Sequence, residues 1–453
     1  MSTKTLLGTV LFELKKTFSD SKHGICQACY KPNTDRDWCQ PCNAEKFRQN
    51  FSNWTSGNKH IDMFIQDAQL TASNHDEVLE WIPNDQLNKV TFIANGKYST
   101  NYKAIWSKGD IIQWDHEKND WSRFHGSINN WSYSQDNSAG LNGRIVALKS
   151  FQDSSDICSE LEKLRHYLQS LKEAIKNDSM LLPLYGITQH PKTSEYMIVT
   201  SYAEGSSLRN NLQYIRKLNW KERLEILLDI AYGLAGLHKS DILHRNLHSG
   251  NVFLFKSLDE KCDRNFSMVG DLGLPQSINY YTSNHEDFYD FLPYVAPEVL
   301  RGNLYTKSAD IYSFGMLMWE LTSGESPFSN IPHDKHLSFD ICSGVRPEIY
   351  HDIPQCFLAL MKRCWSMDPF NRPSAITLCN IFEDWCEYYD DNIKDIDDKN
   401  IQLPIMQFQH ADKLLRSQSK HSSNFYAPYY NTNFGFSSYK TYDNKKDQTR
   451  YYY

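Results

Sequence analysis

The sequence predicts an α+β protein in which a β-rich part precedes a mostly helical part, with a small cysteine-rich region in front of both. Three observations indicate this order. Two Cys-x-x-Cys pairs lie near the start of the chain, short β-like runs begin at Val90, and helical periodicity dominates from about Ser150 to Tyr389. Apolar residues make up 40% of the 453 residues, so the chain can bury a large core and is not disordered as a whole.

Charge and hydropathy exclude several classes of protein. The chain carries 48 Lys and Arg against 55 Asp and Glu, a net charge of −7, and lacks the basic excess that nucleic-acid binding uses. No apolar run approaches the ~20 residues of a membrane-spanning helix. Residues 1–22 are expected to be an N-terminal helix or leader, since the run Leu6–Phe12 is short for a secretory signal. We therefore expect no nucleic-acid partner and no membrane span.

The cysteines indicate both a compartment and a metal site. Of the 11 cysteines, all but four are scattered through apolar-patterned sequence, which is typical of a reduced cytoplasmic or nuclear protein. The remaining four are Cys26, Cys29, Cys39 and Cys42, whose spacing matches the tetrahedral all-sulfur shell of a structural zinc ion. The alternatives are two disulfides, which a reducing compartment disfavours, or a chance spacing. The pattern favours a small zinc knuckle.

The periodicity of apolar residues and the local composition divide the rest of the chain into segments. Residues 23–85 are expected to hold the knuckle and a helical linker, because apolar residues recur near helical spacing from Phe47 to Ile65 with a break at Ser56–Asn58. The following β-like runs are interrupted by a polar insert, residues 107–143, which is rich in Asn, Asp and Ser. Helices are expected at 158–174, 220–238, 309–323, 356–366 and 375–388. The segment 390–453 is polar, rich in Tyr and without periodicity, and is interpreted as a disordered tail.

Four sequence fragments then occur in one order. Val146–Lys149 ends a β-like run, and His244–Asn251, with the sequence HRNLHSGN, follows a helical stretch. Asp271–Gly273 follows a short apolar run, and Ala296–Glu298 precedes Asp310. Each fragment alone is weak evidence, but the four in this order and spacing are close to diagnostic.

These fragments resemble the motifs of the protein kinase superfamily, over about residues 86–389. The resemblance implies a bilobal fold, with a five-stranded antiparallel sheet and one main helix in the N-lobe and a mostly helical C-lobe. The run from Cys364 to Pro373 is most similar to the tyrosine-kinase-like branch of Ser/Thr kinases, and the zinc knuckle and the insert resemble an expanded group of fungal kinase-like proteins. ATP and Mg²⁺ are the cofactors that this resemblance implies.

The resemblance also implies roles for single residues at the nucleotide. Lys149 is expected to meet the α- and β-phosphates, because catalysis of phosphoryl transfer is mostly positioning and charge neutralisation. Asn251 and Asp271 are expected to hold the Mg²⁺ ion that bridges the phosphates. The other residues expected to bind ATP are Gly96, Thr200 and Tyr202.

Other positions are expected to support the fold rather than the chemistry. The resemblance implies that Glu298 pairs with Arg372 and that Asp310 stabilises the catalytic loop, since a buried charge needs a partner. His244 and Leu272 are expected to pack between the lobes.

Two departures from the motifs concern catalysis directly. Asn246 occupies the position of the catalytic aspartate, and an amide takes no proton at neutral pH, so loss of the general base is expected to lower the rate by about 10²–10⁴. The phosphate loop keeps Gly96 but has Ala94 and Ser99 in place of the outer glycines. Asn101 stands where an apolar residue usually covers the adenine, which predicts weaker nucleotide binding.

The acid that pairs with Lys149 is left open. Ungapped spacing places this acid at Leu164, whereas Glu160 lies one turn earlier on the same helix face and Glu162 is also available. Either the helix is shifted or shortened, or the partner is absent.

The substrate class is also left open. Ser/Thr kinases usually carry Lys where this chain has His248 and Thr where it has Phe291, and the segment lacks the tyrosine-kinase pattern as well. Hydroxyl side chains near Arg245 either form a phosphate-ordered activation loop or reflect the abundance of Ser and Tyr. These side chains are Ser277, Tyr280, Tyr281, Thr282 and Ser283.

Three functions are compatible with these observations. The first is a pseudokinase that binds ATP and Mg²⁺ and signals through partner binding or allosteric switching. The second is a slow but active Ser/Thr or dual-specificity protein kinase, which tolerates Asn246 through positioning alone. The third is a nucleotide-free scaffold whose zinc module and C-lobe recruit other proteins. Of these, the sequence favours the first.

Overall fold

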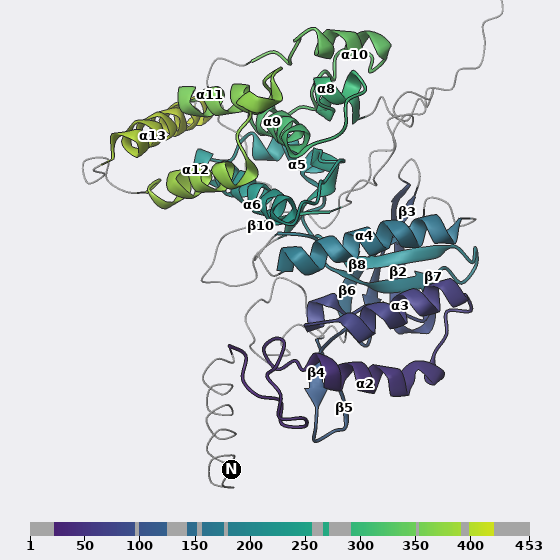
Figure 1. Ribbon diagram of the computed structural model, residues 1–453. Helices are drawn as coiled ribbons and strands as arrows, with labels where there is room; N and C mark the ends of the chain where they lie inside the picture. The colour runs from purple at the N-terminus through teal and green to yellow at the C-terminus, as the bar shows by residue number, and fades with distance from the viewer. Residues whose placement is uncertain are drawn as a thin grey trace, which may run out of the picture.

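The computed structural model describes residues 22–95, 99–124, 143–151, 156–175, 180–255, 266–270, 291–349, 353–390 and 398–420. Several residues with expected roles lie outside these ranges, namely residues 1–21, Gly96, Asp271, Leu272, the residues from Ser277 to Ser283, and the segment from 421 onward. The described chain forms two lobes, with a β-rich lobe below a helical lobe in Figure 1. The α+β class and the bilobal arrangement are therefore confirmed.

A six-stranded sheet forms the centre of the N-lobe. Its strand order is β1-β7-β8-β6-β3-β2, and all neighbours pair antiparallel except β1 and β7. The strands are β1 (Glu80–Trp81), β2 (Leu87–Asn95), β3 (Thr100–Trp106), β6 (Arg144–Ser150), β7 (Leu184–Gln189) and β8 (Tyr196–Ser201). The five antiparallel strands agree with the expectation, and β1 adds a short parallel strand at one edge.

Glycine is required where β1 joins the sheet. A Cβ atom on Gly186 of β7 would lie 2.0 Å from the carbonyl oxygen of Glu80. Only a residue without a side chain allows the two backbones to approach this closely. The extra strand therefore depends on one residue of its neighbour.

Residues 40–71 form two helices that pack on the N-lobe. Helix α2 (Gln40–Asn50) is followed by α3 (Lys59–Thr71), and the predicted break at Ser56–Asn58 separates them. Asn58 caps α3, since its side chain accepts a hydrogen bond from the His60 N–H at 2.9 Å. The main N-lobe helix is α4 (Ile157–Ile175). In Figure 1, α3 lies beside α4, and α2 lies farther from the C-lobe.

Part of the polar insert is ordered. Residues Asp110–Asp115 (β4) and Asp120–Phe124 (β5) form an antiparallel hairpin, which Figure 1 shows next to α2. Sequence analysis did not predict this hairpin, because its aromatic residue Trp121 packs on Phe47 and Trp38, far away in the chain. Residues 125–142 of the insert lie outside the described ranges.

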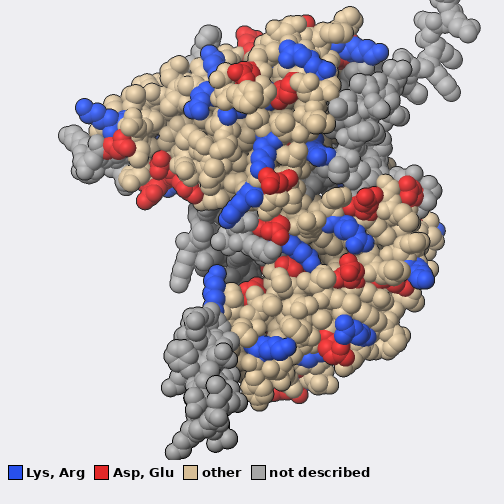
Figure 2. Space-filling model, viewed as in Figure 1, with Lys and Arg blue, Asp and Glu red and all other residues tan. Residues whose placement is uncertain are grey.

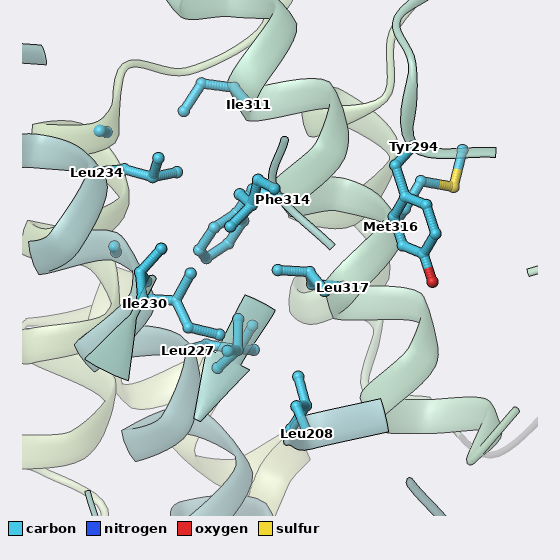
Figure 3. Packing of buried hydrophobic residues seen from close by; sticks show 14 of the residues in the cluster. Leu208, Leu227, Ile230, Leu234, Tyr294, Ile311, Phe314, Met316 and Leu317 are labelled. Carbon is cyan, nitrogen blue, oxygen red and sulfur yellow. The ribbon is translucent and has the colours of Figure 1, made fainter. Parts of the chain in front are cut away.

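The C-lobe is built around two buried helices, α6 (Trp220–Lys239) and α9 (Lys307–Ser323). Figure 3 shows the apolar side chains of these two helices facing each other; they are Leu227, Ile230 and Leu234 from α6 and Ile311, Phe314 and Leu317 from α9. A capping box of Asn219 and Glu222 begins α6. The remaining elements are α5 (Leu208–Ile215), α8 (Pro297–Leu300), α10 (Lys335–Cys342), α11 (Gln355–Cys364), α12 (Ala375–Glu387) and the strand pair β9 (Val252–Phe255) and β10 (Phe266–Val269).

The prediction of a disordered tail from residue 390 is wrong for residues 399–420. These residues form helix α13 (Lys399–Lys420), which packs on α6, α11 and α12. Phe408 is fully buried, with its ring 5.0 Å from Trp385 and 5.5 Å from Trp220. The sequence analysis did not predict this helix because it contains Pro404 and has only a narrow apolar stripe. Tertiary packing rather than helix propensity stabilises it.

The described residues show two further features, one of helix hydropathy and one of surface charge. None of the described helices is long and apolar enough to cross a membrane. On the face in Figure 2, the described basic and acidic side chains are mixed, and both signs occur on each lobe.

Candidate functional site

The loop between α6 and β9 is held by one buried carboxylate. Asp310, in the first turn of α9, accepts hydrogen bonds from the N–H groups of His244 and Arg245, both at 2.9 Å. The Nε2 atom of His238 also lies 2.9 Å from Asp310. Arg245 has a left-handed backbone with φ of 64°, which is unfavourable for a side chain of this size and persists only under such restraint.

The same loop brings Asn246 and Asn251 together. The Nδ2 group of Asn251 donates to the carbonyl oxygen of Asn246 at 3.0 Å. The carbonyl oxygen of Asn251 accepts from the N–H of Gly270 at 2.9 Å, which joins the loop to the end of β10. The loop therefore brings Asn246 and Asn251 together and joins them to Gly270, the residue before Asp271, which lies outside the described residues.

Lys149 lies on the face of the sheet opposite the small core. In β6, Val146 and Leu148 are buried in a small core with Trp106 on one face of the sheet, whereas Ala147 and Lys149 alternate to the other face. Lys149 stands opposite Asn101 of β3 and Ile198 of β8. Residues directly opposite one another share a face, so the polar amide of Asn101 lies on the same side as the lysine.

Thr200 and Tyr202, both expected to bind ATP, lie at the end of β8 and just after it. Thr200 stands opposite Ala147, on the same face as Lys149. The ammonium of Lys103 lies 4.3 Å from the ring centre of Tyr202, a cation–π contact. Burial and the nearby Glu204 raise the pKa of Tyr202 above its ordinary value, so this side chain stays neutral at physiological pH.

Helix α4 offers one buried acid on this side of the sheet. Ile198, opposite Lys149, packs against the core cluster that includes the leucines of α4, so the inner face of α4 and the sheet face of Lys149 border the same core. Glu160 is buried on α4, Glu162 is exposed, and Leu164 lies in the core. Of the two acids that the sequence left open, Glu160 is therefore the one that faces the interior.

Two residues that depart from the Ser/Thr kinase motifs, His248 and Phe291, contact each other. The ring of His248 stacks on Phe291 with centroids 4.4 Å apart and an interplanar angle of 20°. Burial, and then the charge of Arg209, hold the pKa of His248 well below its usual range. The Nδ1 atom of His248 accepts a hydrogen bond from the Gly250 N–H at 3.0 Å, so the proton of this neutral ring is on Nε2. An aromatic stack thus stands where Ser/Thr kinases usually carry Lys and Thr.

Sequence analysis missed a buried carboxylate behind this stack. Glu320 of α9 is fully buried, and its Oε1 accepts from Ser249 Oγ at 2.8 Å and from Tyr294 OH at 2.7 Å. Burial raises its pKa to about 7. Arg209 donates to Ser249 at 3.3 Å and completes the cluster. A single acid within the apolar run Met316–Leu321 was the signal that could have identified it.

Glu298 and Arg372 form a buried bidentate ion pair. The Nη1 group of Arg372 donates to Oε1 of Glu298 at 2.6 Å, and Nη2 donates to Oε2 at 2.8 Å. Arg372 also donates to the carbonyl oxygen of Ser308, in the first turn of α9, at 2.9 Å. The pair therefore joins α8, α9 and the segment before α12.

The four N-terminal cysteines lie together as free thiols. Their Sγ atoms all lie within 4.8 Å of one another, with Cys26 and Cys42 at 3.8 Å and Cys29 and Cys39 at 3.5 Å. A tetrahedral zinc ion with Zn–S bonds of about 2.3 Å requires sulfur atoms about 3.8 Å apart. The donor set and its spacing therefore fit a structural zinc ion, and four cysteines leave no open coordination position.

The fold and these contacts define a protein kinase-like chain. The sequence profile of the protein tyrosine and serine/threonine kinase family matches residues 124–382, more than half of the chain. The chain therefore belongs to this family.

Similar proteins carry related descriptions. A putative serine/threonine-protein kinase/receptor of Acanthamoeba polyphaga mimivirus is 35% identical over 186 residues, which are 40% of this chain and 10% of that protein. A probable serine/threonine-protein kinase of Dictyostelium discoideum is 28% identical over 244 residues, 53% of this chain and 25% of the relative. A probable LIM domain-containing serine/threonine-protein kinase of the same organism is 29% identical over 241 residues, 52% and 35% of the two chains. The matches span about a third of these relatives' lengths or less.

Proposed function

We propose that the chain is a kinase-like signalling protein that binds ATP with Mg²⁺ and transfers the γ-phosphate slowly or not at all, that is, a pseudokinase. One observation carries the proposal: Asn246 replaces the proton acceptor in a loop whose backbone is otherwise held in place by Asp310. The family implies ATP and Mg²⁺ in general. In this proposal the chain lacks the carboxylate that accepts the proton, while the backbone of the loop keeps its position.

The proposal assigns the nucleotide to the sheet face that carries Lys149. Lys149 would neutralise the phosphates, with Thr200 and Tyr202 beside the base. Asn251 and Asp271 would hold Mg²⁺, which spreads the negative charge of the phosphates. The register of β3, β6 and β8 supports the first assignment, because Lys149 and Thr200 share one face.

His248 does not replace the missing aspartate in this proposal. A general base needs a free lone pair, and the Nδ1 lone pair of His248 already accepts the Gly250 N–H. Its lowered pKa also disfavours the protonated ring that proton transfer would produce. His248 therefore acts as a neutral group in the loop rather than as a base or a cation.

A slow Ser/Thr or dual-specificity kinase is the second candidate. The observation that favours it is the intact hydrogen bonding of the loop, in which the Arg245 N–H donates to Asp310 and the Asn251 side chain donates to the carbonyl oxygen of Asn246. Because the transition state of phosphoryl transfer is loose, positioning and charge neutralisation alone support a residual rate.

For the N-terminal region we propose a structural zinc ion on Cys26, Cys29, Cys39 and Cys42, within a cytoplasmic or nuclear protein. The sulfur spacing supports the ion, and the free thiols support a reducing compartment. Metal analysis of the purified chain is expected to find one zinc per chain. A chain without zinc would remove this assignment.

The test of function measures γ-phosphate transfer from Mg·ATP to a generic protein substrate and to the chain itself. Wild type is compared with Asn246→Asp and with Asp271→Asn as the inactive control. A pseudokinase is expected to stay at the control level, while Asn246→Asp gains activity by about 10²-fold or more. Transfer by the wild type above the control would instead establish the slow kinase.

A thermal shift with Mg·ATP separates both candidates from a nucleotide-free scaffold. A ligand that binds only the folded state raises its stability with concentration. We expect a concentration-dependent rise for the wild type, and a smaller one for Asp271→Asn. A wild-type melting temperature that does not respond to Mg·ATP would contradict both candidates and favour the scaffold.

A further inference from the structure

The cysteine cluster is connected to the kinase domain through an aromatic stack. We call residues 22–79, with the four cysteines, α2 and α3, the N-terminal module. Trp121 of the insert hairpin stacks on Phe47 of α2 at 4.5 Å and 17°, and on Trp38, the residue before Cys39, at 5.9 Å. Trp38 is fully buried and donates from Nε1 to the carbonyl oxygen of Ala72, at the end of α3, at 3.0 Å. The cysteine loop thus fixes the end of α3.

The insert hairpin joins this module to the N-lobe sheet. Arg123 of β5 forms a bidentate pair with Glu80 of β1, at 2.9 and 2.7 Å. Asp110 of β4 pairs with Arg144 of β6 at 3.3 Å, and Arg144 donates to the hydroxyl of Tyr185 in β7 at 3.1 Å. All five side chains are buried or half-buried, so solvent screens these contacts only weakly. The module and the sheet are therefore linked on the side of the insert.

A second contact joins α3 of the module to α4. Apolar side chains of both helices share one core; they are Ile61, Phe64, Ile65 and Ala68 from α3 and Leu161, Leu164, Leu168 and Leu171 from α4. Lys172 of α4 donates to Thr71 Oγ1 at 2.9 Å and lies 3.5 Å from the buried carboxylate of Glu77. Arg165 of α4 pairs with Asp67 at 3.3 Å. Figure 1 shows α3 running alongside α4.

We infer that metal binding at the four cysteines positions helix α4, and through it the nucleotide site. Helix α4 carries the buried Glu160, and its leucines border the same core as the sheet face of Lys149. A metal that fixes the cysteine loop fixes Trp38, the end of α3 and thereby the contacts of α4. The module is then an internal support whose apolar surfaces are used by α4 and the hairpin, not a free recruitment domain. The effect on nucleotide affinity rests on the proposed ATP binding.

The first experiment uses hydrogen exchange on the full chain, with zinc bound, after removal of zinc by a chelator, and after zinc is restored. We expect the amides of 157–175 to lose protection when zinc is removed and to regain it when zinc is added. The amides of α9 serve as the internal control and are expected to keep their protection. Unchanged protection of α4 after metal removal would overturn the inference, whether or not the chain binds ATP.

The second experiment measures the Kd of Mg·ATP in the same three states. We expect removal of zinc to raise the Kd about fivefold or more, within the usual range of coupling between sites. If α4 loses protection while the Kd stays the same, the coupling to the nucleotide site is refuted. If no state binds ATP, the proposed function fails, and the exchange data alone decide the positioning of α4.

A pair of variants tests the contact without touching the cysteines. Lys172→Met removes the hydrogen bond to Thr71 and the ion pair with Glu77, while keeping the length of the side chain. Gln169→Ala, on the exposed face of the same helix, is the matched control. We expect Lys172→Met to retain zinc and to show part of the protection loss and of the Kd increase, and Gln169→Ala to show neither. Equal behaviour of the two variants would contradict a role for this contact.

Discussion

The charge state of Glu320 gives a prediction whose size follows from the structure. The carboxylate is fully buried in α9, and its only described hydrogen-bond donors are the hydroxyls of Ser249 and Tyr294. Because burial penalises the charged form, its pKa is raised from 4.5 to about 7. Glu320→Gln imitates the protonated acid, since the amide oxygen can still accept both hydroxyl hydrogens.

The sign and magnitude follow from proton linkage. Between pH 4.5 and 7 the folded chain retains a proton on Glu320 that the unfolded chain has released, so the free energy of unfolding falls as the pH rises. Each pH unit in this window is worth about 1.4 kcal/mol, and the sum from pH 5 to pH 8 is about 2.5 kcal/mol. The contribution is largest at low pH, declines up to about pH 7, and then levels off. Glu320→Gln removes this term.

The assay is urea unfolding of wild type and Glu320→Gln at several pH values from 5 to 8. The difference in unfolding free energy, variant minus wild type, is expected to increase by about 2.5 kcal/mol across this range. Glu387→Gln, an exposed acid at the end of α12, is the control and should show a flat difference. A difference for Glu320→Gln that stays constant within about 0.5 kcal/mol would refute the reasoning.

Three further predictions concern the loop, an ion pair and the last helix. In an Asn246→Asp background, replacing His248 by Lys and Phe291 by Thr together should raise the rate of phosphoryl transfer by more than the product of the two single effects; effects that simply multiply in a kinase assay would show that the stack is not one unit. Arg372→Met leaves the buried Glu298 carboxylate unpaired and should lower the unfolding free energy by about 3–5 kcal/mol, whereas a loss below about 1 kcal/mol in urea unfolding would contradict a buried pair. Phe408→Ala should lower it by about 3–5 kcal/mol, and an unchanged midpoint would show that α13 is not part of the C-lobe.

Local patterns in the sequence predicted much of this protein. Helical periodicity placed α4, α6, α9, α11 and α12 to within a few residues at each end, because the apolar face of a helix repeats along the chain itself. The four cysteines were identified by spacing alone, since two tight turns bring the thiols together without help from the rest of the fold. The order of the kinase-like fragments predicted the bilobal fold.

Contacts between distant segments could not be predicted in this way. His248 and Phe291 were each recognised as departures, yet only the fold brings the two rings into one stack. The burial of Glu320 also depends on α9 lying at the centre of the C-lobe, where hydroxyls from two other segments reach it. A sequence pattern does not state which residues will lose contact with water.

The sequence by itself determined the kinase family and the four-cysteine cluster. Only the tertiary structure decided that Glu160 rather than Glu162 faces the interior, that α13 belongs to the C-lobe, and that the N-terminal module packs on α4. The physical reason is that secondary structure and the clustering of the four cysteines follow from neighbours in the chain. Burial and packing instead follow from which surfaces meet, and those surfaces are formed by residues far apart in sequence.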